Sequence, residues 1–126
     1  MRDLFQEQLN ELNRELTIMG SSCEEIIALA SQALTDWDEE LVQKVNTIGA
    51  QIDESERTIE TICMKLLLRQ QPVARDLRQI SAAMKMITDM ERIGDQAEDI
   101  VEIVPYMNTH PDEKYPKIRD RHLSPR

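Results

Sequence analysis

The chain of 126 residues has very few aromatic side chains, since Phe, Tyr and Trp together make up 3% of it. A core without aromatic bulk must be built from aliphatic residues and Met, of which there are seven. Such side chains suit packing of helix against helix, where they interdigitate along the helix surfaces. Glycine is also scarce, at three residues. These shortages favour an all-α protein.

Basic charge is in short supply as well. The chain has 15 Lys and Arg against 24 Asp and Glu, which gives a net charge of −9. Proteins that bind phosphate backbones normally present a basic face, so nucleic acid is not an expected partner. No stretch approaches the roughly 20 apolar residues of a membrane span, and the first residues lack the apolar run of a signal peptide. We therefore expect a cytoplasmic protein without membrane insertion.

Histidine is almost missing, which limits the chemistry that the chain can perform. His110 and His122 are the two His residues, so the Glu-x-x-His pairs of ferritin-like di-iron bundles are absent. HExxH, Gly-rich phosphate loops and Ser-His-Asp candidates are absent too. We do not expect an enzyme. Cys23 and Cys63 form no CxxC motif, and both fit buried, reduced thiols.

Three long amphipathic patterns are what the sequence does contain. Apolar residues recur at alternating steps of three and four, which places them on one face of a helix. The patterns run from Phe5 to Trp37, from Leu41 to Leu66 and from Val73 to Val101. They predict one helix over about 3–34, a second ending near residue 69 and a third over about 72–104.

The corners between these helices have recognisable signals. Thr35 with Asp38, or Asp36 with Glu39, has the spacing of a capping box. Gln70-Gln71-Pro72 predicts the second corner with a proline opening the next helix, and Pro105 is expected to stop that helix. Short corners between long helices force antiparallel neighbours. We predict an elongated up-down-up three-helix bundle over residues 1–104 and an extended tail over 105–126.

An acid interrupts the third pattern. Glu91 stands where an apolar residue is expected, and Asp95 follows one turn later on the same face. In an antiparallel bundle Asp53 comes level with this stretch, so that Asp53, Asp89, Glu91 and Asp95 fall within roughly 10–15 Å along the axis. Gly94, between the acids, favours a close approach of the helices. The grouping predicts an acidic cluster at mid-height.

A bound divalent or trivalent cation would relieve both the repulsion between these acids and the cost of placing one on an apolar face. The other interpretation is that the acids are solvated or pair with Lys85 and Arg92. The sequence leaves both open.

Two sequence blocks carry a family resemblance. Residues 70–78 (QQPVARDLR) and 88–95 (TDMERIGD) follow residues 45–60, which fit a V…IDxxExxIE pattern. In these features residues 1–104 resemble PhoU, a bacterial family of phosphate-transport and phosphate-signalling accessory proteins. The resemblance implies half of a six-helix fold of two tandem three-helix repeats. This chain would then be a single-repeat or truncated form.

The resemblance also implies a function. PhoU proteins bind clusters of iron or zinc through acidic motifs, and they restrain the phosphate-starvation response by contacting a sensor histidine kinase and the ATPase of the phosphate ABC transporter. Matched residue by residue, the metal ligands here would be Asp53, Glu91 and Asp95. Gly49 stands where the family usually has a further Asp, and neither Gln51 nor Glu56 can easily replace it from its own face.

A basic cluster surrounds the second corner, made of Arg69, Arg75 and Arg78. Its simpler interpretation is ion pairing with Asp76 and neighbouring acids, and its functional interpretation is partner docking. Because three long helices leave apolar surface exposed, we expect a homodimer, which would also restore six helices. Two other functions remain open: a metal-binding or metal-storage bundle, and a truncated dimerising fragment without a signalling role.

Overall fold

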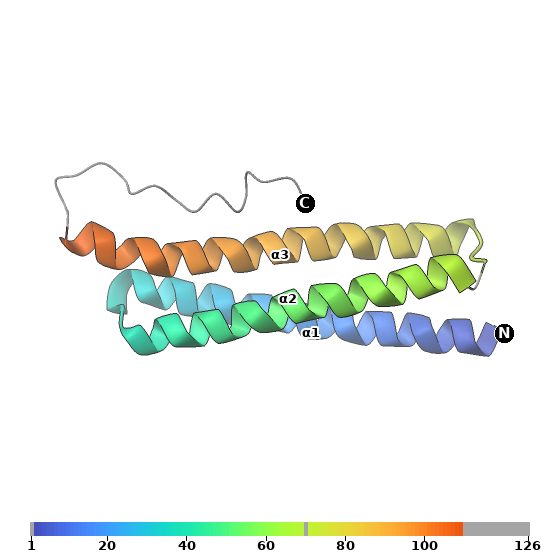
Figure 1. Cartoon of the computed structure of the whole chain (residues 1–126), viewed down its shortest axis with the longest axis horizontal. Helices are drawn as coiled ribbons and strands as arrows, with labels where there is room; N and C mark the ends of the chain where they lie inside the picture. The colour runs from blue at the N-terminus through green and yellow to red at the C-terminus, as the bar shows by residue number, and fades with distance from the viewer. Residues whose placement is uncertain (1, 70, 110–126) are drawn as a thin grey trace.

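The computed structural model describes residues 2–69 and 71–109. Three helices make up this part: α1 (Arg2–Asp36), α2 (Glu39–Arg69) and α3 (Ala74–Thr109). They lie side by side with alternating direction, and each packs against both others (Figure 1). No strand occurs among the described residues, which confirms the all-α, up-down-up bundle. None of these helices has an apolar stretch long enough to cross a membrane.

The core follows the first two sequence patterns closely. Their residues are buried, apart from Leu16 and Trp37, which are half-buried. The third pattern is wrong in part. Val73, Leu77 and Met84, at steps of four and seven along that pattern, are 59%, 41% and 38% exposed. Ala83 and Ala97 face the core instead. Ile80, Ile87 and Val101 are buried as predicted, so the pattern misplaces single steps along α3 rather than the whole face.

The first corner is capped by a single acid. The Leu41 N–H donates to Asp38 Oδ1 at 2.8 Å, so Asp38 satisfies one of the free amides at the start of α2. Both predicted capping pairs are wrong, because Thr35 and Asp36 still belong to α1. The Thr35 hydroxyl donates to the Gln32 carbonyl within that helix.

The second corner places the start of α3 two residues later than predicted. Gln71 turns the chain with a φ of 46°, and α3 begins at Ala74 rather than at Pro72. The Val73 N–H donates to Asp76 Oδ2 at 3.4 Å, and Asp76 is only 2% exposed. An acid in the first turn therefore faces inward to cap α3.

The prediction that Pro105 stops the third helix is wrong, because α3 runs through it to Thr109. Pro105 has no N–H for the Val101 carbonyl, the usual acceptor four residues earlier. The Trp37 indole N–H donates to that carbonyl at 3.0 Å. The Val101 carbonyl therefore accepts a hydrogen bond from Trp37, just after α1, in place of the missing N–H. The helix can then continue past Pro105. The predicted tail beyond residue 109 lies outside the described residues.

Candidate metal centre

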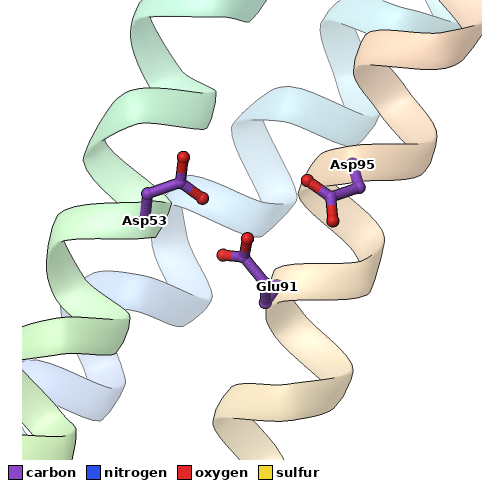
Figure 2. Close-up of side chains that lie close together, drawn as sticks. All are labelled: Asp53, Glu91 and Asp95. Atoms are coloured by element: carbon purple, nitrogen blue, oxygen red, sulfur yellow. The ribbon is translucent and has the colours of Figure 1, made fainter. Parts of the chain in front are cut away.

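Three carboxylates meet between α2 and α3 at mid-height of the bundle. Asp53 comes from α2, and Glu91 and Asp95 come from successive turns of α3. One oxygen of each lies within 4.8 Å of the others. Figure 2 shows the three carboxylates directed toward the space between the two helices. The structure thus brings together the three residues that the sequence singled out as metal ligands.

Burial differs among these acids. Glu91 is 6% exposed, and Asp53 and Asp95 are half-buried. A carboxylate in such surroundings loses much of its hydration, which is costly for a charge unless other groups compensate. A cation would compensate all three acids at once.

Glycine explains why α2 and α3 come so close here. A Cβ placed on Gly94 would lie 3.3 Å from Ile52 Cδ1, which is tighter than ordinary packing. Ile52 precedes Asp53, and Gly94 precedes Asp95. The expected role of Gly94 in close helix approach is confirmed, and this contact draws the acids of the two helices together.

The α1 side of the cluster carries a thiol. Cys23 is buried, and its Sγ donates to the Met90 carbonyl at 3.5 Å. Burial, and then the negative charge of Glu91, raise the pKa of the Cys23 thiol. Burial, followed by Glu60, raises the pKa of Cys63 to about 11. Both cysteines are free and buried, as predicted, and the raised pKa of each favours the neutral thiol.

Asp89 does not join the cluster, so its inclusion was wrong. Its Oδ1 pairs with Arg92 Nη1 at 3.6 Å on the exposed face of α3. Two residues along a helix is more than half a turn, so Asp89 and Glu91 have nearly opposite directions. For Asp89 the simpler interpretation, an exposed ion pair with Arg92, is the correct one. Such pairs add little stability.

The donor set fits the cation that the family resemblance implies. Carboxylate oxygens are hard ligands, suited to divalent and trivalent ions. Asp53, Glu91 and Asp95 would hold such an ion, and it would link α2 to α3. This fit rests on the chemistry and the spacing of the three acids.

The basic cluster lies at the far end of the bundle from the first corner. Arg75 and Arg78 are exposed on the first turns of α3. The side chain of Arg69 lies outside the described part of the chain. Asp76, the proposed ion-pair partner, faces inward and accepts the Val73 N–H. A docking role for the arginines stays a prediction.

Comparison with known proteins decides the family. The family model described as the PhoU domain matches residues 16–104, well over half of the chain. The chain belongs to the PhoU family. The matched range includes Asp53, Glu91 and Asp95, so the whole acidic cluster lies inside the PhoU domain.

Several curated relatives match as well, among them three named phosphate-specific transport system accessory protein PhoU homolog. The Synechocystis relative is 36% identical over 110 residues, which cover 87% of this chain and 49% of the relative. The Clostridium acetobutylicum relative is 38% identical, with 85% and 49% covered. The Pseudomonas aeruginosa relative is 40% identical, with 76% and 40% covered. The chain thus spans half or less of these relatives. No solved structure gives a significant match.

One acid of this PhoU domain was missed by the sequence interpretation. Glu98 lies on the third pattern, between Gly94 and Val101, and the sequence interpretation assigned it no role. Its carboxylate lies against Gly49, because a Cβ on Gly49 would be 2.8 Å from Glu98 Oε1 and 2.9 Å from Cδ. The available signal was the spacing, since Glu98 lies seven residues, or two turns, after Glu91.

Proposed function

We propose that this PhoU family chain is a non-enzymatic, cytoplasmic regulator of phosphate uptake and of phosphate-starvation signalling. The observation that carries the proposal is the PhoU domain match across all three helices, together with relatives that are named as accessory proteins of phosphate transport. The chain acts by docking on a sensor histidine kinase and on the ATPase of the phosphate ABC transporter.

The acidic cluster gives the regulator a metal centre of iron or zinc, held by Asp53, Glu91 and Asp95. When bound, the ion neutralises the cluster and fixes α2 against α3. The support is the meeting of three carboxylates within 4.8 Å, one of them buried. The three acids would hold the ion, and the ion would fix the packing of the bundle at mid-height.

The docking surface is the arginine corner formed by Arg69, Arg75 and Arg78. Arg75 and Arg78 are exposed, and the rest of the chain is strongly acidic, at a net charge of −9. A local basic patch on an acidic protein can select and orient an acidic partner surface. The kinase and the ATPase would each present such a surface.

Binding to purified partners tests the function. The full chain is immobilised, and the cytoplasmic part of the sensor kinase and the transporter ATPase from the same organism are passed over it. We expect both to bind, and we expect Arg75→Ala with Arg78→Ala to weaken binding at least about tenfold, or about 1.4 kcal/mol. Arg57→Ala is the matched control, because Arg57 is exposed on α2 away from the corner.

Each other function has its own outcome when the metal content of the chain is measured beside partner binding. A metal-storage bundle would bind iron or zinc but neither partner protein. A truncated dimerising fragment would bind neither metal nor partner. If the chain binds neither the kinase nor the ATPase, the regulatory function is overturned, whatever the metal content of the chain.

A further inference from the structure

The second corner, between α2 and α3, carries exposed apolar side chains at one end of the bundle (Figure 1). Leu68 is 75% exposed, which makes it the most exposed large apolar side chain among the described residues. Val73, on the other side of the corner, is 59% exposed. Met64 and Leu77, about one turn further back on each helix, are exposed as well. Exposed apolar residues gathered in this way mark a contact with another surface.

Basic charge gathers around the same corner. Residues 61–88 hold five of the 15 basic residues of the chain but only one of its 24 acids. That acid is Asp76, which is buried. Lys65, Arg75 and Arg78 are exposed, and none of them pairs with an acid of the described residues. The corner is therefore locally cationic on a chain whose net charge is −9.

The apolar and the basic side chains lie at different depths from the end of the bundle. Leu68 and Val73 flank the corner, whereas Lys65 comes three residues before Leu68 and Arg78 five residues after Val73. At 1.5 Å per helical residue, the basic residues begin about 5–8 Å behind the apolar ones. Elements that lie in a membrane interface bury their apolar residues roughly 5–10 Å deep, while long basic side chains reach the headgroups. A lipid surface matches this order, and it accepts a protruding end without a matching hollow.

We propose that the second corner binds the surface of an anionic lipid bilayer, with Leu68 and Val73 entering the interface and Arg75 and Arg78 meeting the lipid phosphates. The negative headgroups complement the charge of the corner, and each basic residue near such a surface adds attraction. This inference goes beyond the docking on proteins proposed above, because it needs no partner protein. The contact is peripheral, and the bundle meets the bilayer by one end.

Acids elsewhere on the surface orient the bundle on the bilayer. Asp3 and Glu7 are exposed at the start of α1, which lies at the same end as the second corner (Figure 1). Their repulsion from anionic lipid confines the contact to the α2–α3 side. The opposite end, around the first corner, carries the exposed acids Asp38, Glu39 and Glu40. Repulsion turns that end away from the bilayer.

Vesicle flotation of the full chain tests the inference. Vesicles of phosphatidylcholine alone are compared with vesicles of equal parts phosphatidylcholine and phosphatidylglycerol, at low and at high salt. We expect binding to the mixed vesicles at low salt, and loss of binding at high salt, because salt screens the attraction. We expect no binding to phosphatidylcholine alone. Equal binding to both kinds of vesicle would overturn the inference.

A pair of matched variants tests the place of the charge. We expect Arg75→Ala with Arg78→Ala to weaken binding to the mixed vesicles at least about tenfold. The control is Lys44→Ala with Arg92→Ala, which has the same net charge but removes exposed cations that pair with acids away from the corner. This control should bind like the unaltered chain. An equal loss in both double variants would contradict a role of the corner.

A second pair of variants tests the apolar contact. Leu68→Gln with Val73→Gln should also weaken binding to the mixed vesicles at least about tenfold, because the interface loses two buried apolar side chains. Ile18→Gln with Met107→Gln is the control, since these side chains are 51% and 44% exposed away from the corner. Helix content by circular dichroism confirms that each variant is folded. Unchanged binding of the corner variant would overturn the inference.

Tryptophan fluorescence reports which end of the bundle meets the lipid. Trp37, the one Trp of the chain, lies at the first corner, so its emission should not change when the unaltered chain binds mixed vesicles. Leu68→Trp in a Trp37→Phe background places the indole at the second corner. Its emission should shift to the blue, because the ring enters a less polar interface. The opposite pattern of shifts would contradict the assigned end.

The outcomes separate this inference from the proposed function. If no vesicle binds the chain while the kinase or the ATPase does, the corner serves protein docking and only this inference falls. If the mixed vesicles bind the chain through the corner while neither protein binds, this inference stands and the regulatory function falls. If the chain binds neither lipid nor partner proteins, both fall.

Discussion

A proline inside a helix leaves one carbonyl without its usual donor, and Trp37 supplies that donor here. The indole N–H reaches the Val101 carbonyl, which Pro105 cannot serve. A residue at the first corner thereby permits the last turns of α3. Trp37 ends the first apolar pattern, and its half-buried ring packs against the core while its N–H makes this specific hydrogen bond.

The variant Trp37→Phe tests this role, because it removes the indole N–H that donates to the Val101 carbonyl. We expect the free energy of unfolding to fall by about 1–2 kcal/mol beyond the lost ring area, because a part-buried carbonyl loses its donor. With Pro105→Ala already present, the cost of Trp37→Phe should be smaller, since the substituted residue regains an N–H. Urea unfolding of the four proteins gives the double-mutant cycle. Equal costs in both backgrounds would contradict the assigned role.

At the scale of the helix, the ends of the elements are decided by individual caps. The start of α2 depends on Asp38, whose Oδ1 accepts the Leu41 N–H. At the start of α3, Asp76 faces inward and accepts the Val73 N–H, whereas Val73 and Leu77 are 59% and 41% exposed. At this end of the bundle the inward-facing residue is therefore the capping acid, and the apolar residues of the third pattern lie at the surface.

The cap at Asp38 can be measured against its neighbour. We expect Asp38→Ala to lower the free energy of unfolding by about 1 kcal/mol, the usual cost of losing an N-cap side chain. Asp36→Ala should be neutral or slightly stabilising, because Asp36 ends α1, where a negative charge is unfavourable. Thermal or urea unfolding of the two variants measures both changes in the free energy of unfolding. The reverse order of effects would place the helix start at Asp36, as one of the sequence-based alternatives had it.

At the scale of the whole molecule, apolar surface remains exposed along α1 and α3. Ile27 and Leu34 are 47% and 63% exposed, and together with the half-buried Ile93 and Ile100 they line a hollow between the two helices. Curated relatives are about twice the length that this chain matches. A second copy of the chain is the occupant we predict for this surface.

Analytical ultracentrifugation of the full chain measures its oligomeric state and so tests this prediction. We expect a dimer, and we expect Ile27→Lys with Leu34→Lys to give monomers, because the charges would face a dry apolar contact. Leu4→Lys is the control, since Leu4 is 49% exposed near the start of α1, away from the hollow. A monomeric unaltered chain would remove the homodimer. A dimer that persists in the double variant would place its interface elsewhere.

The candidate site was predictable in part. Asp53, Glu91 and Asp95 were grouped correctly, because antiparallel helices of known rise set the heights of their residues. Asp89 was grouped wrongly, because height along an axis does not give direction around it. Glu98 was missed for the opposite reason, since only the contact with Gly49 on another helix reveals its place.

Sequence alone determined the class of fold, the number of helices and the region of each corner. These follow from apolar periodicity and from local turn and cap residues, which act within a few positions of the chain. The tertiary structure alone decided that α3 passes Pro105, that Asp89 faces away and that Glu98 fills the space beside Gly49. Each depends on how one helix is rotated against another, and that rotation is set by packing between residues far apart in the chain.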